Sequence, residues 1–193
     1  MSQSHSQKSP NPQGKGGTTE IALLSEIRSF AVAPAKTVTQ IASELFTALF
    51  ILGSEFSFKP VVEKSYSLYR KNGRFRLSLI SPSEWRCSTF GEYIGQCELQ
   101  CDMSWSLELS KEAQHDAELM DYIEEKRAAF DQRMEMAQNI EQMLPQYIPT
   151  LPYYQRAFAS ALASSLAISM RKSGIDGLNY QNAKAHCLSV DVD

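Results

Sequence analysis

The sequence has few of the residues that carry common enzymatic chemistries. It contains three histidines, one of them near the N-terminus, and four cysteines without regular spacing. It also lacks a Gly-x-Ser-x-Gly elbow, a glycine-rich phosphate loop that follows a strand, and a His-Glu-x-x-His helix. We therefore expect no catalytic, cofactor-binding or metal-binding residues, and no cofactor.

Long apolar segments are missing as well. The most apolar stretch, Ile41–Leu52, has 12 residues and is interrupted by Ser43, Glu44 and Thr47, whereas a membrane-spanning helix needs about 20 apolar residues. The N-terminus, MSQSHSQKSP, lacks the apolar region of a secretory signal. A formal net charge of −3 gives no electrostatic reason to bind nucleic acid or anionic lipid. These features predict a cytoplasmic protein that does not bind membranes.

The cysteines do not form a metal-binding set. Cys97 and Cys101 fall on the same face of a predicted strand, where four residues span about 13 Å at about 3.3 Å per residue. Two ligands of one zinc ion, each about 2.3 Å from the metal, lie much closer together. We therefore interpret these cysteines as small core residues, and a chain of this size needs no disulfide bonds.

What the chain does contain is a composition typical of a folded protein, with 43% hydrophobic and 21% charged residues in a length of 193. Residues 1–17 have Met1 as their only apolar residue and predict a disordered tail. Residues 18–110 predict a helix plus a β-meander core. Residues 111–174 predict a C-terminal helical hairpin that packs on this core or extends from it, and residues 175–193 predict a weakly ordered tail.

The clearest structural signal is the Asn72-Gly73 pair. In a type I′ turn both central residues need positive φ, which Asn and Gly tolerate best. This turn predicts a β-hairpin in which alternate side chains share a face. The register would pair Lys71 with Arg74, Arg70 with Phe75, Tyr69 with Arg76, Leu68 with Leu77, and Tyr66 with Leu79. The apolar face would contain Tyr66, Leu68, Phe75, Leu77 and Leu79, and the polar face Ser67, Tyr69, Lys71, Arg74, Arg76 and Ser78.

Residues 97–109 alternate between apolar and polar side chains without interruption, which is typical of a strand with one buried face. The polar positions of this strand include Glu98 and Asp102, whereas those of the hairpin are basic. Opposite charges on neighbouring strands attract one another. We therefore expect an α+β fold built on a three-stranded antiparallel meander, with N-terminal helices and two longer C-terminal helices packed on it.

Apolar residues at helical spacing predict four helices. Two precede the hairpin, over about residues 20–30 and from Pro34 to a stop at Gly53. Two follow it, from Ser110 to about Leu144 and over about residues 153–172. A charged residue interrupts the apolar heptad spacing of the third helix, so we expect this helix to pack on its own domain rather than in a long coiled coil.

Aromatic residues are concentrated around the predicted sheet. Most must lie in the core, and a surplus left exposed, for which Tyr69 and Trp85 are the candidates, would mark a partner-binding site. Arg74 and Arg76 fall on the same face of the hairpin as Tyr69. We therefore predict Tyr69, Arg74, Arg76 and Trp85 as candidate partner-binding residues.

Several short motifs resemble a known family. They are Phe58-Lys59-Pro60-Val61-Val62, Tyr66-Ser67-Leu68-Tyr69, Leu77-Ser78-Leu79-Ile80-Ser81-Pro82-Ser83-Glu84-Trp85 and Asp102-Met103-Ser104-Trp105. Together they resemble the conserved core of the uncharacterised DUF2452 family over about residues 45–108, roughly a third of the chain. The resemblance implies a small hairpin-centred module preceded by a helix, and it implies no activity. In the family pattern a His often stands at the position of Met103, so no imidazole chemistry carries over to it.

Few ionisable residues converge in this sequence, whereas its core is well specified. We therefore expect a non-catalytic protein-interaction or structural assembly module whose partner is another protein or a second copy of the chain. One alternative is a small intracellular enzyme with a site near the loop after the hairpin, formed by Trp85, Cys87 and His115. Another is a weak nucleic-acid binder that uses the basic hairpin face. The predicted acidic neighbours Glu98 and Asp102 and the negative net charge oppose this second alternative.

Overall fold

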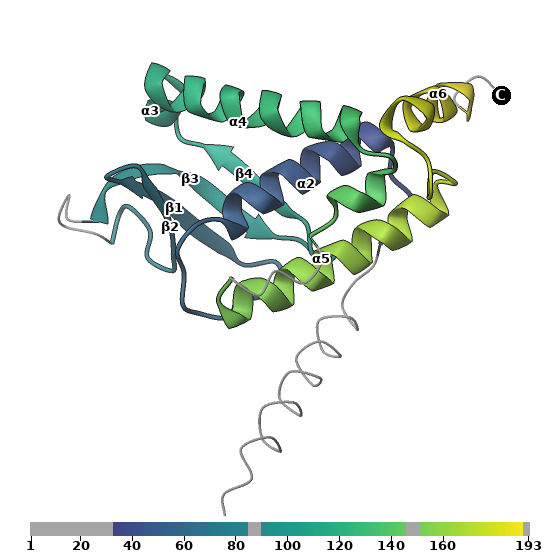
Figure 1. The fold of residues 1–193 in the computed structure, drawn as a ribbon. Helices are drawn as coiled ribbons and strands as arrows, with labels where there is room; N and C mark the ends of the chain where they lie inside the picture. Colours follow the sequence, from purple (N-terminus) through teal and green to yellow (C-terminus); the bar gives the residue numbers. More distant parts are fainter. Residues whose placement is uncertain (1–32, 85–89, 146–150, 191–193) are drawn as a thin grey trace, which may run out of the picture.

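Four antiparallel strands form a sheet, one face of which is covered by helices (Figure 1). The structure, a computed structural model, describes residues 33–84, 90–145 and 151–190, apart from the side chains of residues 187–190. The strands are β1 (Ser65–Lys71), β2 (Arg74–Ser78), β3 (Glu92–Leu99) and β4 (Trp105–Leu109). The helices are α2 (Val38–Leu52), α3 (Lys111–Gln114), α4 (Ala117–Met136), α5 (Tyr153–Lys172) and α6 (Tyr180–Val190), with a 3₁₀ helix, η2 (Ile140–Met143), between α4 and α5. The predicted α+β class is therefore confirmed.

The hairpin of β1 and β2 forms around the expected turn. Asn72 and Gly73 have φ values of 52° and 72°, the positive values that a type I′ turn requires. The pairs Lys71 with Arg74, Arg70 with Phe75, Tyr69 with Arg76, and Leu68 with Leu77 are present. β2 ends at Ser78, so the predicted pair of Tyr66 with Leu79 does not extend the ladder, and Leu79 is 54% exposed instead of buried.

The predicted third strand is in fact two strands, so the expectation of three strands is wrong. β3 ends at Leu99, and the chain turns back tightly before β4: the Ser104 carbonyl accepts from the Gln100 amide at 2.9 Å, and Met103 adopts a φ of 68°. Alternation conceals this turn because the inward-facing residues have odd numbers on both sides of it. Both strands therefore direct their apolar side chains to the same face of the sheet.

The strand order is β2-β1-β3-β4, so the sheet is not a meander. β3 pairs with β1, while the outer edge of β2 is bridged by Glu55. This order separates the predicted acidic strand residues from the arginines of β2. Glu98 lies opposite Ser65 on β1, and Asp102 forms an ion pair with Lys36.

Helix α2 begins later than the predicted start at Pro34. The Thr37 hydroxyl accepts from the Gln40 amide, and the Gln40 side chain accepts from the Thr37 amide. This capping box satisfies backbone groups at the helix start and fixes it at Val38. The predicted stop at Gly53 is confirmed. The helix expected over residues 20–30, like the predicted tail over residues 1–17, lies outside the described residues.

The predicted helix from Ser110 to Leu144 is divided into α3, α4 and η2. Ser110 caps α3, and Asp116 then caps α4 by accepting from the Leu119 amide at 3.1 Å. Side chains that cap a helix also compete with continuous helix formation, because they offer the backbone a local hydrogen bond. The division therefore follows from a second capping residue inside the predicted helix.

The segment after α5 is more ordered than expected. Helix α5 has the predicted bounds, and α6 follows it within the segment for which we expect a weakly ordered tail. Ile175, Tyr180 and Ala183 are buried in the core. The described part of this segment therefore contains a helix and buried core residues. Its apolar residues are too few to show a helical period, but Ile175, Tyr180 and Ala183 all join the hydrophobic core.

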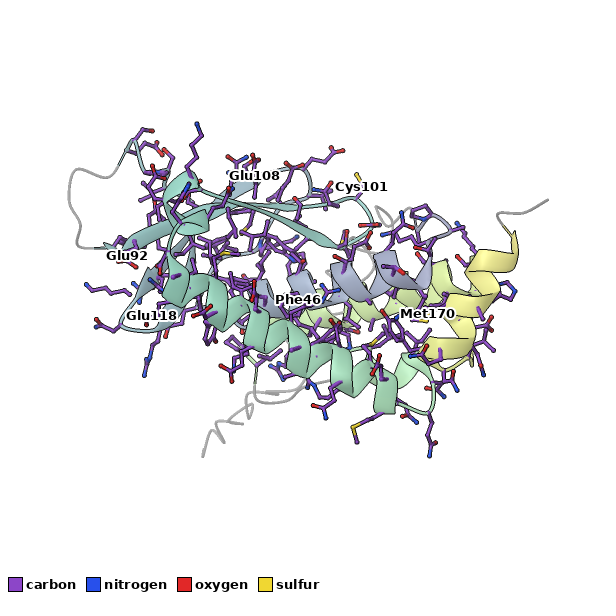
Figure 2. The ribbon with its side chains drawn as sticks, turned by 90° about the horizontal axis from the view of Figure 1, so that it is seen from above. Phe46, Glu92, Cys101, Glu108, Glu118 and Met170 are labelled. Atoms are coloured by element: carbon purple, nitrogen blue, oxygen red, sulfur yellow. The ribbon has the colours of Figure 1, made fainter. Side chains whose placement is uncertain are left out.

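Helices α4, α2 and α5 cover one face of the sheet, with α2 between the other two (Figure 1). Phe130 of α4 and Phe158 of α5 belong to the same hydrophobic core as Leu68 of β1 and Trp105 of β4. The C-terminal helices therefore pack on the sheet domain and do not extend away from it. The opposite face of the sheet carries polar side chains, and Figure 2 shows Glu108 of β4 on that side.

Candidate protein-interaction surface

Tyr69 is buried, although its place on the polar face of the hairpin suggested exposure. It is 3% exposed, and its hydroxyl donates to the Ile80 carbonyl at 3.0 Å. Its ring contacts those of Phe90 and Tyr93. Burial raises the pKa of the Tyr69 hydroxyl. The expectation of an exposed Tyr69 is therefore wrong, because the segment after β2 contacts this face of the sheet. Trp85, its predicted companion, lies outside the described residues.

Arg74 and Arg76 are exposed near the hairpin turn, and the structure brings them together. Both guanidinium groups pair with Glu55, at 3.4 and 3.1 Å. The hydrogen bond from Arg76, with the charge of both arginines, holds the pKa of the Glu55 carboxyl below its usual range. Arg76 also lies over the Phe90 ring, 5.4 Å from its centroid. These arginines therefore serve to hold Glu55 against the edge of β2.

The structure describes only His115 of the three residues predicted for an enzymatic site. His115 is exposed at the end of α3, where Nδ1 lies 2.6 Å from a carbonyl oxygen of the same helix. Burial raises the pKa of the Cys97 thiol to about 12. The Cys101 thiol donates to a Glu63 carboxylate at 3.1 Å, which raises its pKa as well. A thiolate is the reactive form of cysteine, so neither described thiol is poised as a nucleophile. Cys87 lies outside the described residues.

A buried group of charges links the start of the described chain to the sheet. The Lys36 ammonium contacts the carboxylates of Glu44 on α2 and Asp102 in the β3–β4 turn, and the Lys36 side chain is 8% exposed. Burial alone would raise the pKa of Asp102, but hydrogen bonds from Lys36 and Ser104 outweigh it and lower this pKa. Burial raises the pKa of Glu44. A single lysine pairs with both carboxylates, so this group of charges cross-links three segments of the chain. Neither carboxylate is left free to bind a metal ion.

The surface that best fits a binding role is a hollow of about 240 Å³ between α2, β2 and α4. We call it the aromatic groove and define it by Phe46, Phe50, Phe75, Tyr122 and Phe130. The rings form a continuous row, with centroids 5.6 Å apart for Phe130 and Phe46, 6.4 Å for Phe46 and Phe50, 4.9 Å for Phe50 and Phe75, and 5.8 Å for Phe75 and Tyr122. Figure 2 shows Phe46 between α2 and α4.

Three elements position these rings. Phe46 and Phe50 lie one turn apart on α2, outside the buried stripe that faces the sheet. Phe75 extends from β2, and Tyr122 and Phe130 from α4. Phe130 is fully buried and anchors the row, whereas Tyr122 is 38% exposed. This groove was not predicted from the sequence. The available signal was the pair of phenylalanines on the polar side of the predicted helix.

Charges of opposite sign lie at the two ends of the groove. Lys126 and Arg133 of α4 line it, and the Lys126 ammonium lies 5.2 Å from the centroid of the Tyr122 ring. A second hollow of about 320 Å³ continues past Phe75 and Tyr122 toward the hairpin turn. Its lining includes the acidic residues Glu118, Asp121 and Glu125. The groove thus passes from a basic region to an acidic region along a single helix.

Arg70 fixes the acidic end in place. It extends from β1, and its guanidinium contacts the carboxylates of Glu92 on β3 and Asp116 at the start of α4. Asp116 also accepts hydrogen bonds from the first turn of α4, and together with the Arg70 charge these lower the pKa of its carboxyl. The hairpin, β3 and α4 are therefore held together beside the second hollow, which Arg70 lines.

Comparison with known proteins finds one family model that matches part of the chain. Residues 52–126 match the model of a family described as "Protein of unknown function (DUF2452)", which confirms the resemblance seen in the sequence. The matched segment includes Phe75, Tyr122 and Lys126 of the groove. No curated protein and no solved structure matches the chain significantly. Among the described residues, no helix is long and apolar enough to cross a membrane.

Proposed function

We propose that this chain is a non-catalytic protein-interaction module and that the aromatic groove is its binding surface. The observation that supports this proposal is the continuous row of partly exposed rings between α2 and α4. Aromatic side chains supply large contact areas at low cost in conformational entropy, and they are enriched where proteins bind one another. The cationic side chains of Lys126 and Arg133 would orient a partner by its charge.

The groove is preformed, which favours binding. Phe50 is held against Phe75, and Phe46 is held against the buried ring of Phe130. Side chains already fixed in their bound positions do not lose further rotamer freedom when a partner docks. A groove with these rings therefore binds more tightly than the same residues would on a mobile loop.

Neither alternative function is favoured by a specific observation. Nucleic-acid binding needs basic residues that are available to phosphates. On the hairpin, however, Arg74 and Arg76 share Glu55, and Arg70 is bound by two carboxylates. An enzymatic site needs a base or nucleophile beside converging polar groups, and the described thiols have raised pKa values.

Affinity capture of the tagged full-length protein from its own cells, followed by mass spectrometry, tests the proposal. The wild type is compared with a Tyr122→Ala, Lys126→Glu double variant. The matched control is Lys184→Glu, because Lys184 also lies over a tyrosine ring, that of Tyr180, on α6. We expect a stoichiometric partner, either another protein or a second copy, that the groove variant loses and the control retains.

Two results would contradict the proposal. One is a partner that binds the groove variant as well as the wild type, which would place the interface elsewhere. The other is clean isolation of a monomer without any partner. Circular dichroism of each variant establishes that loss of binding does not come from loss of the fold.

A further inference from the structure

One face of α4 has a regular sequence of exposed residues along the groove. Glu118, Tyr122, Lys126, Ala129 and Arg133 are separated by four, four, three and four positions, so they lie on the same side of the helix. All five are exposed. At about 1.5 Å per residue, the row is about 22 Å long. It is distinct from the buried side of α4, which is formed by Leu119, Phe130 and Met134.

The charges at the two ends of this row lack partners within the described structure. Glu118 and Arg133 form no ion pair with another described residue. Their helix, in contrast, uses Asp116 and Arg127 in ion pairs of their own. The row therefore has an unpaired carboxylate at one end and an unpaired guanidinium at the other.

The positions of this row are also symmetric about its centre, so the row is complementary to a second copy of itself. The midpoint between Glu118 and Arg133 is also the midpoint between Tyr122 and Ala129, and it falls between Glu125 and Lys126. A two-fold axis through this point, perpendicular to α4, would bring each acidic residue to a basic residue of a second copy. It would also bring Tyr122, the largest side chain of the row, next to the partner's Ala129, the smallest.

We infer that the occupant of the aromatic groove is a second copy of this chain, docked through an antiparallel pair of α4 helices. In this dimer Glu118 faces the partner's Arg133, and Tyr122 lies over the partner's Ala129 next to the aromatic row. The same contacts occur twice because the interface is isologous. This inference rests on the proposed function, since it names the partner of the same groove.

Charge complementarity is the reason to prefer a second copy over an unrelated helix. An unrelated partner needs a positively charged side chain near Glu118 and a negatively charged one near Arg133, and the two must be separated by the length of the row. A second copy of α4 supplies both at the right separation when it runs antiparallel. The exposed Ala129 lets the helices approach closely, and Met136, which is 77% exposed, provides further apolar surface beyond the row.

Sedimentation equilibrium of the full chain at micromolar concentrations tests this inference. The wild type is expected to be a dimer. Glu118→Arg and Arg133→Glu each place like charges together twice per dimer, so each variant is expected to weaken dimerisation by about tenfold or more. The matched control is Glu124→Arg, an exposed reversal on another side of α4 that should leave the dimer unchanged.

The decisive step is to mix the two variants. Only the antiparallel arrangement pairs the new arginine at position 118 of one chain with the new glutamate at position 133 of the other, while the native pair survives at the second site. The mixture is therefore expected to recover the wild-type dimerisation constant. The double variant Glu118→Arg, Arg133→Glu should recover it as well.

A wild type that stays monomeric at these concentrations would overturn the inference, and so would a dimer that both reversals leave intact. A mixture that remains monomeric would overturn the antiparallel arrangement of α4. None of these results removes the proposed function if capture still yields a different protein that depends on Tyr122. Loss of that dependence would remove the proposed function by itself.

Discussion

Gly95 shows how one residue sets the distance between two strands. It lies on β3 opposite Leu109 of β4. A Cβ atom at this position would collide with the Glu108 carbonyl oxygen and lie 2.9 Å from the Leu109 Cα atom. The sequence gives no sign of this contact, because the strand partner of Gly95 comes from beyond a turn that the alternation conceals.

We therefore expect Gly95→Ala to destabilise the protein by about 2–4 kcal/mol, because the β3–β4 pair must separate to admit the methyl group. Urea denaturation measures the free energy of unfolding. Gly73→Ala is the control: its φ is +72°, but nothing lies within 4 Å of an added Cβ. That control should cost only about 1 kcal/mol from backbone strain. Equal costs at the two positions would contradict the packing argument.

A pH dependence follows from Asp102. Its lowered pKa means that the folded state holds the charged carboxylate more strongly than the unfolded state does. This contribution to stability is present above the ordinary value of 3.8 and is lost as the pH falls through the lowered pKa. Glu44, whose pKa is raised by burial, has the opposite pH dependence: its contribution to stability is lost as the pH rises.

Asp102→Asn should therefore cost about 1–3 kcal/mol near pH 7, because it leaves the buried Lys36 with one carboxylate. The difference between wild type and variant should shrink as the pH falls below about 4. Chemical denaturation at a series of pH values measures it, with the exposed Asp176→Asn as control. A difference that stays constant across the series would show that charge is not the cause.

At the scale of single elements, the sequence predicts the ends of segments less well than their periodicity. The buried stripe of α2 and the hairpin register follow directly from side-chain period. Proline at a helix start is only permissive, whereas the hydrogen bonds of Thr37 and Gln40 select the start. Tight turns and internal caps cannot be found from period alone, which is why β3–β4 and α3–α4 were each predicted as one element.

The capping box makes a testable contribution to α2. Thr37→Ala removes the hydroxyl that accepts from the Gln40 amide, so it should cost about 1 kcal/mol of unfolding free energy. Thr39→Ala, at an exposed position in the first turn of the same helix, should change stability by less than about 0.5 kcal/mol. The midpoint of urea denaturation distinguishes them. If Thr39→Ala is the more costly change, the cap does not determine where α2 begins.

At the scale of the whole molecule, features that depend on distant segments were not predictable. The aromatic groove combines rings from α2, β2 and α4, and no local pattern brings Phe46 next to Phe130. Tyr69 alternates onto the polar face of its strand, yet Phe90 and the segment after β2 cover it. The C-terminal segment is similar, because Ile175 is buried in a core that residues of several helices and strands share.

Ile175 provides a test of that segment. Ile175→Ala should cost about 2–4 kcal/mol, because it empties a fully buried position in the core shared by α2 and α5. Ile168→Ala, the same change at a position that is 36% exposed, should cost less than about 1.5 kcal/mol. Thermal and urea denaturation give both values. A negligible cost at Ile175 would mean that the segment after α5 does not stabilise the fold.

Photocrosslinking in cells tests most directly whether the chain binds protein at the aromatic groove. A photoreactive phenylalanine analogue replaces Tyr122 in one version of the protein and Gln96, which is exposed on the polar side of the sheet, in another. We predict a covalent adduct of defined mass, with another protein or a second copy, at position 122 and not at position 96. Adducts at position 96 alone, or at neither position, would contradict the assignment of the groove as the binding surface.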